Sequence, residues 1–186
     1  MGLKFKKIKR TMYTANRDQN LVLRLEYAKV MIGLLEEGYR VLNIDETWIA
    51  ESDFRRRKWQ VKGTTNSAPE VYVQPRITLI SAIDNHGKTY HSLIQANSNV
   101  LIMRLFLTHL AEALDYEHNH WRKNTVVLLD GAKYHLNEQT QKHCAFLGIK
   151  VIFSGPQSYD TAPAELLFSM VKSTNLNPLC KKMGKK

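Results

Sequence analysis

The stretch Thr125-Val126-Val127-Leu128-Leu129-Asp130-Gly131 decides the fold expected for this chain. Its consecutive apolar residues predict a fully buried strand, which ends on a carboxylate followed by glycine. A second stretch, Val41-Leu42-Asn43-Ile44-Asp45-Glu46, ends in much the same way. Sites in open α/β sheets lie at the carboxyl ends of the strands. If these two strands are parallel neighbours, Asp45 and Asp130 lie close together at one edge of the sheet.

Apolar spacing elsewhere in the sequence predicts a single α/β domain. We expect helices over residues 17–37, about 99–116, 136–147 and 163–174, and strands over 41–47, within 71–83, and over 89–96, 125–130 and 151–153. The tetrad Asp84-Asn85-His86-Gly87 predicts a hairpin turn. An antiparallel meander followed by βαβ units gives a mixed five-stranded sheet flanked by helices.

The helices are expected to pack through apolar residues that recur at helical spacing. In the first helix these residues are Leu21, Leu25, Ala28, Ile32 and Leu35. The helix that follows Asn99 carries apolar residues on more than one face, so we expect it to be well buried. The buried side of the last helix is expected to hold Leu167, Met170 and Val171. Residues 118–123 are expected to form a polar connection.

Composition narrows the class of partner. The formal net charge of +10 and the pI of about 9.6 indicate nucleic acid first and an anionic membrane surface second, with simple solubility as the alternative. No apolar run approaches the roughly 18 residues that span a bilayer. Cys144 and Cys180 are too few for a disulfide framework. We therefore expect a soluble, intracellular protein with free thiols.

Basic segments flank the expected domain, which covers residues 17–175. Residues 1–16 are interpreted as a linker or arm, which could be a nuclear address, a DNA contact or only a solvated tail. Residues 176–186 form a basic tail.

A basic aromatic segment lies between the first two strands. The run Arg55-Arg56-Arg57-Lys58-Trp59, with a turn at Lys62-Gly63, suits phosphate contacts beside a stacking ring. The alternative is an exposed hairpin whose Trp59 covers the edge of the core.

A third acid joins the two aspartates in our hypothesis. Glu165 opens the last helix, on a polar stripe that continues through Ser169 and Lys172. We expect Asp45, Asp130 and Glu165 to converge on Mg²⁺ or Mn²⁺, which prefer carboxylate oxygens. Two such ions would support in-line phosphoryl transfer on a phosphodiester. Taken singly, an Asp at a strand end more often caps a turn, and a Glu in a first helical turn more often answers the helix dipole.

Three blocks of the sequence resemble the catalytic domain of Tc1/mariner and bacterial IS630-type transposases. The first is Ile44-Asp45-Glu46-Thr47-Trp48 with the basic run that follows it, and the second is Leu129-Asp130-Gly131-Ala132-Lys133-Tyr134-His135. The third is Pro156-Gln157-Ser158-Tyr159-Asp160-Thr161-Ala162-Pro163-Ala164-Glu165. The chain departs from the family pattern at Gly131, where Asn is usual, and at Phe168, where Trp is frequent.

The resemblance implies an RNase H-like fold and a DDE triad of Asp45, Asp130 and Glu165 that binds Mg²⁺ or Mn²⁺, with two ions expected. It implies cleavage of transposon-end DNA and strand transfer into target DNA, without a small-molecule cofactor or a membrane partner. Glu46 and His135 would support the site. The expected DNA-binding residues are Arg55, Arg56, Arg57, Lys58, Trp59, Lys62 and Lys172.

The resemblance also carries expectations about the whole protein. It implies a homodimer when the protein is full length, and a location in the nucleus of a eukaryote or in the cytoplasm and nucleoid of a bacterium. The family's N-terminal helix-turn-helix DNA-binding domain is not found ahead of the catalytic domain in this sequence. A domesticated or decayed fragment that binds DNA without catalysis is therefore an alternative, as is an RNase H-like nuclease acting on RNA–DNA hybrids.

Overall fold

The computed structural model describes residues 16–49, 63, 77–156, 158 and 162–173. Its helices are α1 (Asp18–Glu36), α3 (Val100–Glu117), α4 (Trp121–Asn124), α5 (Glu138–Leu147) and α6 (Pro163–Ser173). Its strands are β1 (Arg40–Ile49), β2 (Ile77–Asp84), β3 (Thr89–Gln95), β4 (Thr125–Leu129) and β5 (Lys150–Phe153). None of the described helices is long and apolar enough to cross a membrane.

The strands form one sheet in the order β3-β2-β1-β4-β5. β1 pairs antiparallel with β2, and β2 pairs antiparallel with β3. β4 lies between β1 and β5 and is parallel to both. The predicted mixed five-stranded sheet is therefore confirmed, and the strands that lead to Asp45 and Asp130 are parallel neighbours.

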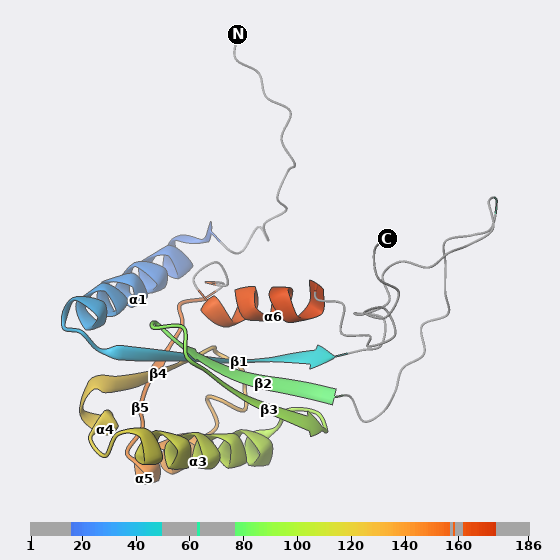
Figure 1. Cartoon of the computed structure of the whole chain (residues 1–186). Helices are drawn as coiled ribbons and strands as arrows, with labels where there is room; N and C mark the ends of the chain where they lie inside the picture. Colours follow the sequence, from blue (N-terminus) through green and yellow to red (C-terminus); the bar gives the residue numbers. More distant parts are fainter. Residues whose placement is uncertain (1–15, 50–62, 64–76, 157, 159–161, 174–186) are drawn as a thin grey trace, which may run out of the picture.

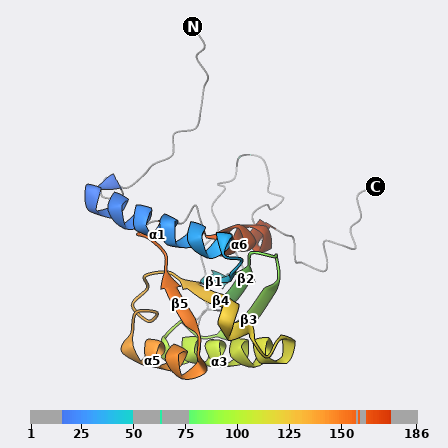
Figure 2. The same ribbon diagram turned by 90° about the vertical axis from the view of Figure 1, so that its left-hand side faces the viewer.

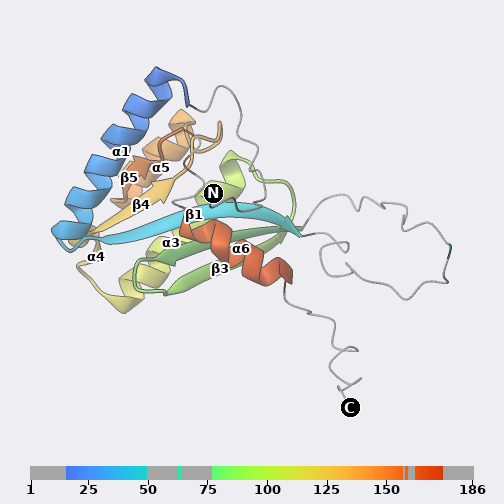
Figure 3. The same ribbon diagram turned by 90° about the horizontal axis from the view of Figure 1, so that it is seen from above.

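Helices cover both faces of this sheet. α1 and α6 lie over one face, and α3 and α5 lie over the other (Figures 1 and 2). Side chains alternate along β1, so that Leu42 and Ile44 join the main core beneath α3, whereas Val41 packs in a second cluster with side chains of α1. Viewed from above, α6 crosses β1 beside α1 (Figure 3).

The packing face of α1 differs from the expectation. Leu21, Leu25, Ile32 and Leu35 are 46–56 % exposed. The helix instead packs through Tyr27, Met31 and Leu34. Both sets of residues recur at helical spacing, on stripes roughly 100° apart around the axis. Periodicity alone cannot choose between two apolar stripes, and contact with the sheet made the choice.

Three smaller expectations about packing are also wrong. α3 is buried along one face rather than all round, and its Leu101 and Leu105 are exposed. α6 buries Ala164 and Phe168, and Val171 packs against them as expected, whereas Met170 is exposed. The expected polar connection contains the short helix α4.

Trp121 of α4 is buried in the main core, and its indole N–H donates to Asp115 at 2.8 Å. A single aromatic ring among polar neighbours was enough to draw this segment inward, because burying it removes a large apolar surface from water.

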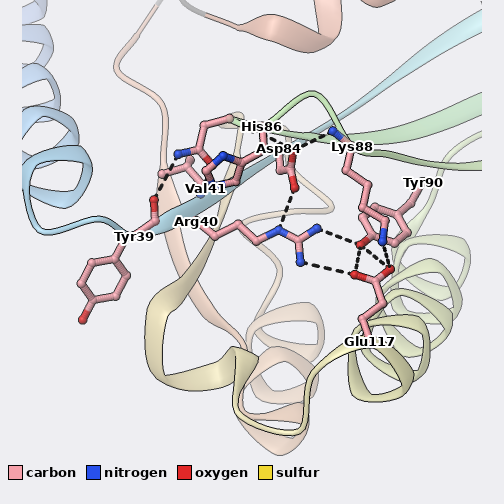
Figure 4. Close-up of polar contacts among 9 residues, drawn as sticks. Tyr39, Arg40, Val41, Asp84, His86, Lys88, Tyr90 and Glu117 are labelled. Carbon is pink, nitrogen blue, oxygen red and sulfur yellow. Dashed lines mark hydrogen bonds and ion pairs between the residues drawn. The ribbon is translucent and has the colours of Figure 1, made fainter.

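A charged cluster ties the start of β1 to the β2–β3 hairpin and to the end of α3 (Figure 4). Arg40 donates from Nε to Asp84 Oδ2 at 2.7 Å and from Nη2 to the Tyr90 hydroxyl at 2.9 Å. Tyr90 donates in turn to Glu117, which also pairs with Lys88 at 2.6 Å. We call these five residues the Arg40 cluster. Arg40 and Asp84 are nearly buried, so their charges depend on each other for compensation.

We predict that Arg40→Met lowers the free energy of unfolding by about 2 to 4 kcal/mol, because it leaves Asp84 and Glu117 without their shared cation. Lys88→Met is the matched control, since Lys88 is half exposed and solvent screens its pairing with Glu117. Urea unfolding of both variants measures the difference. Equal stability of the two variants would show that the buried guanidinium has no special role.

Candidate active site

The register of β1 and β4 brings Asp45 level with Asp130. The parallel pairing joins Arg40 to Thr125 and Asn43 to Leu128 with a constant offset. Carried two residues further, the same offset matches Asp45 with Asp130, the first residue beyond the end of β4. Two carboxylates therefore meet where the two strands end their pairing.

A buried asparagine places the third acid. Asn43 lies two residues before Asp45, on the same face of β1, and its Oδ1 accepts a hydrogen bond from the backbone N–H of Ala164 at 3.0 Å. This bond caps the N-terminus of α6 from a distance and sets the position of Glu165, the next residue. Sequence reasoning missed Asn43, although a polar residue inside an otherwise apolar strand was a signal for such a role.

The three acids line one cavity of about 540 Å³, together with Leu23 and Tyr27 of α1. The middle of β1, the chain after β4 and the start of α6 each supply one acid. As they stand, no three His, Cys, Asp or Glu side chains of the described residues form a ready metal-binding group. The acids share the cavity without forming a closed set of ligands.

The electrostatics of the cavity favour a cation. Burial, together with the neighbouring Glu46, Asp130 and Glu165, raises the pKa of Asp45 to about 7, against a lowering by the N–H of Glu46. A carboxyl group whose ionisation is disfavoured by other acids is relieved when a cation binds among them. Carboxylate oxygens are also the ligands that Mg²⁺ and Mn²⁺ prefer, so the donor set fits the expected metal.

Asp130 is in a different environment. Its Oδ1 accepts from His135 Nδ1 at 2.6 Å and from the backbone N–H of Ala132 at 3.0 Å. The bond from His135, followed by the N–H of Ala132, lowers the pKa of Asp130 despite partial burial. One acid of the pair is therefore held ionised, while Asp45 titrates near neutrality.

His135 connects Asp130 to Glu46. Its ring is fully buried, and its Nε2 lies 3.1 Å from Glu46 Oε1. Burial lowers the pKa of His135, but hydrogen bonds to Asp130 and Glu46 outweigh it and raise the pKa to about 9. The ring is thus an imidazolium at neutral pH and donates from both nitrogens. The Tyr134 hydroxyl donates to the other oxygen of Glu46, at 2.8 Å.

A close approach of α1 shapes one wall of the cavity. Gly155 lies in the loop after β5, and a Cβ built on it would stand 3.0 Å from Ser158 Oγ and 3.2 Å from the backbone Cα of Arg24. Any larger residue would push against the backbone of α1. Glycine here lets α1 and the loop close together over the strand ends.

The residues expected to bind DNA fall mostly outside the described part of the chain. Arg55, Arg56, Arg57, Lys58, Trp59 and Lys62 all lie there, and their role stays a prediction. Lys172 is half-buried in the last turn of α6 and is not among the described residues that line the cavity. It lies seven positions after Glu165 along the helix, a rise of roughly 10 Å.

We predict that Asn43→Ala lowers the free energy of unfolding by about 1 to 3 kcal/mol, because the N–H of Ala164 loses its buried partner. Asn99→Ala is the matched control, since Asn99 caps α3 through the same kind of bond to Ile102 N. Only Asn43→Ala should also weaken Mn²⁺ binding, measured by titration, because only Asn43 positions Glu165. Unchanged Mn²⁺ affinity of Asn43→Ala would show that this hydrogen bond stabilises the fold but does not position Glu165 for the metal.

A second prediction concerns pH. Because the pKa of Asp45 is raised from 3.8 to about 7, the folded protein binds this proton more tightly than the unfolded chain, and stability is lost as the pH rises between these values. Asp45→Asn should therefore stabilise the metal-free protein at pH 8 by roughly 1 to 3 kcal/mol. This gain should shrink as the pH falls toward 4, as urea unfolding across the pH range would show. A gain that does not depend on pH would contradict this account.

Comparison with known proteins identifies the family and the fold. Residues 40–183 match the family model of the DDE superfamily endonucleases. No curated protein sequence matches the chain. Among solved structures, the Mos1 mariner paired-end complex with Mn matches with a TM-score of 0.68 and 22 % identity, covering 92 % of this chain and 53 % of that chain. The catalytic domain of Mos1 mariner transposase matches with a TM-score of 0.59 and 18 % identity, and the match covers 95 % of this chain and 82 % of that chain.

The chain thus spans about half the length of the transposase chains in the paired-end complexes and most of the separate catalytic domain. The structural matches confirm the predicted RNase H-like fold, and the family match covers most of the sequence. The chain belongs to the DDE superfamily endonuclease family and has the fold of the mariner transposase catalytic domain.

Proposed function

We propose that this chain is the catalytic domain of a DNA transposase, which cuts transposon-end DNA and joins it to target DNA by in-line phosphoryl transfer. The observation that carries the proposal is the cavity onto which Asp45, Asp130 and Glu165 open from three separate segments. These are the acids that the family resemblance assigns to the DDE triad. We propose that they hold Mg²⁺ or Mn²⁺, with two ions in the active complex.

The residues of the chain have distinct parts in this reaction. Bound divalent ions would supply activation of a water or 3′-hydroxyl nucleophile and stabilisation of the departing oxygen. Asp130 is kept ionised by His135, so its carboxylate can bind a metal ion. Asp45 carries a proton over part of the neutral range and releases it when positive charge arrives. Glu165 lies on the exposed start of α6, where a phosphodiester can reach it.

DNA is the proposed partner. The net charge of +10 favours a polyanion. The Mos1 transposase matched here was solved as a paired-end complex with the left transposon end, and Mos1 structures also contain Mn or Mg. We extend these partners to this chain, with the basic residues between β1 and β2 as the proposed DNA contacts. A homodimer that acts in the nucleus of a eukaryote, or in the cytoplasm and nucleoid of a bacterium, completes the proposal.

The test is metal-dependent nicking of supercoiled plasmid. We predict that the chain nicks plasmid in Mn²⁺ or Mg²⁺, that chelation abolishes nicking, and that Asp130→Asn reduces the rate by at least about 100-fold, since it removes a charged ligand. Glu117→Gln, which removes an acid from the Arg40 cluster, is the matched control and should nick at the wild-type rate. An RNA–DNA hybrid, compared with duplex DNA, tests the hybrid nuclease alternative.

One outcome would redirect the proposal. If the wild-type chain binds DNA in a salt-sensitive manner, does not nick it with either metal, and binds equally well after loss of all three acids, the chain acts as a DNA-binding protein without catalysis.

A further inference from the structure

Glu46 lies beside the proposed catalytic cavity but is not one of its three acids. Its side chain is only 5 % exposed. Its Oε1 accepts from His135 Nε2 at 3.1 Å, and its Oε2 accepts from the Tyr134 hydroxyl at 2.8 Å. Burial of an acid is unfavourable unless it is paired and hydrogen-bonded, and here both oxygens have partners. Two residues of the segment after β4 therefore hold Glu46 of β1 in a single orientation.

His135 extends this constraint to Asp130. Its ring is fully buried, and its second nitrogen, Nδ1, lies 2.6 Å from Asp130 Oδ1. The same Oδ1 accepts from Ala132 N. Among the hydrogen bonds between described residues, none involves Asp130 Oδ2. Oδ1 of Asp130 is thus held by hydrogen bonds within the protein, and Oδ2 can bind a metal ion.

We propose that Glu46 is a positioning residue, which acts through His135 to fix the Asp130 carboxylate so that Oδ1 is held by the protein and Oδ2 is kept for the divalent ion. This proposal rests on the proposed function of the site. With an acid at each nitrogen, the imidazole cannot turn about its bond to Cβ without losing both partners. Outer partners of this kind commonly set the affinity of a metal site.

A second role for Glu46 would give a similar phenotype. Its negative charge lies close to Asp45 and could attract a cation through space, without His135. The two roles need different properties of the side chain. Positioning needs an oxygen that reaches His135 and Tyr134, whereas attraction through space needs only an acid.

Two substitutions of Glu46 distinguish the effect of its side-chain length from the effect of its charge. Glu46→Asp keeps the acid but shortens the side chain by one methylene, so that it no longer reaches both partners. Glu46→Gln keeps the length and an acceptor for His135 but removes the charge. We expect Glu46→Asp to weaken Mn²⁺ binding by about tenfold, and Glu46→Gln to weaken it less. The measurement is a titration of the whole chain with Mn²⁺, in which electron paramagnetic resonance monitors the concentration of free ion.

Matched controls isolate the effect. Glu117→Asp makes the same change in the Arg40 cluster and should leave Mn²⁺ affinity at the wild-type value. Thermal unfolding of each variant shows whether it is folded. Tyr134→Phe is a second variant for the case in which Glu46→Asp does not fold, because it removes one anchor of Glu46 and keeps the acid. Positioning predicts weaker Mn²⁺ binding by Tyr134→Phe, and attraction through space predicts no change.

The proposal is overturned if Glu46→Asp binds Mn²⁺ as tightly as the wild type or as tightly as Glu46→Gln, or if Tyr134→Phe binds Mn²⁺ like the wild type. Asp130→Asn distinguishes this failure from failure of the proposed function. If Asp130→Asn also leaves Mn²⁺ binding unchanged, the metal site itself is wrong. If Asp130→Asn loses binding while Glu46→Asp retains it, only the role of Glu46 is wrong.

Discussion

The parallel pairing of β1 with β4 is the constraint on which the rest of the structure depends. It brings two carboxylates to the same level just beyond the point where the pairing of these two strands stops, and there their charges repel. Burial above all, and then the neighbouring acids Glu46, Asp130 and Glu165, raise the pKa of Asp45. The surrounding structure opposes the repulsion on one side only, with the His135 imidazolium against Asp130. The other side is left open to the cavity, which is why the fold favours a cation there.

The start and the middle of β1 are stabilised in different ways. At its start, the Arg40 cluster compensates every buried charge with a partner and fixes the hairpin and α3 against the strand. In its middle, around Asp45, acids gather without enough cations among the described residues to balance them. Apolar packing on both faces of the sheet holds the strands in place in spite of this repulsion. A site destabilised by its own charges is typical of catalytic centres, where ligand binding supplies the missing compensation.

Local patterns in the sequence were sufficient to predict the strands and the acids that they carry or lead to, whereas the parallel pairing of β1 with β4 was a condition of the hypothesis that the register fulfils. The run Val126–Leu129 has one plausible structure, and an acid after a buried strand has one plausible location. The contacts that complete the site could not be predicted in this way, because they join distant parts of the chain. Asn43 reaches Ala164, and Glu46 reaches His135. The packing face of α1 was missed for another reason, since its sequence offers two apolar stripes and only the sheet distinguishes them.

The three acids differ in how they tolerate changes in chain length. Strand pairing, not the connecting segments, sets the level of Asp45 against Asp130, so residues can be inserted between β1 and β4 without separating these two. Glu165 depends instead on how α6 is anchored, by the bond from Ala164 to Asn43 and by the packing of Ala164 and Phe168 against Leu79. A slip of α6 by one residue against this anchor would turn Glu165 by about 100° around the helix axis and remove it from the cavity. Displacement of the third acid by a small insertion or deletion before α6 is therefore one route by which such a domain becomes inactive while keeping its fold.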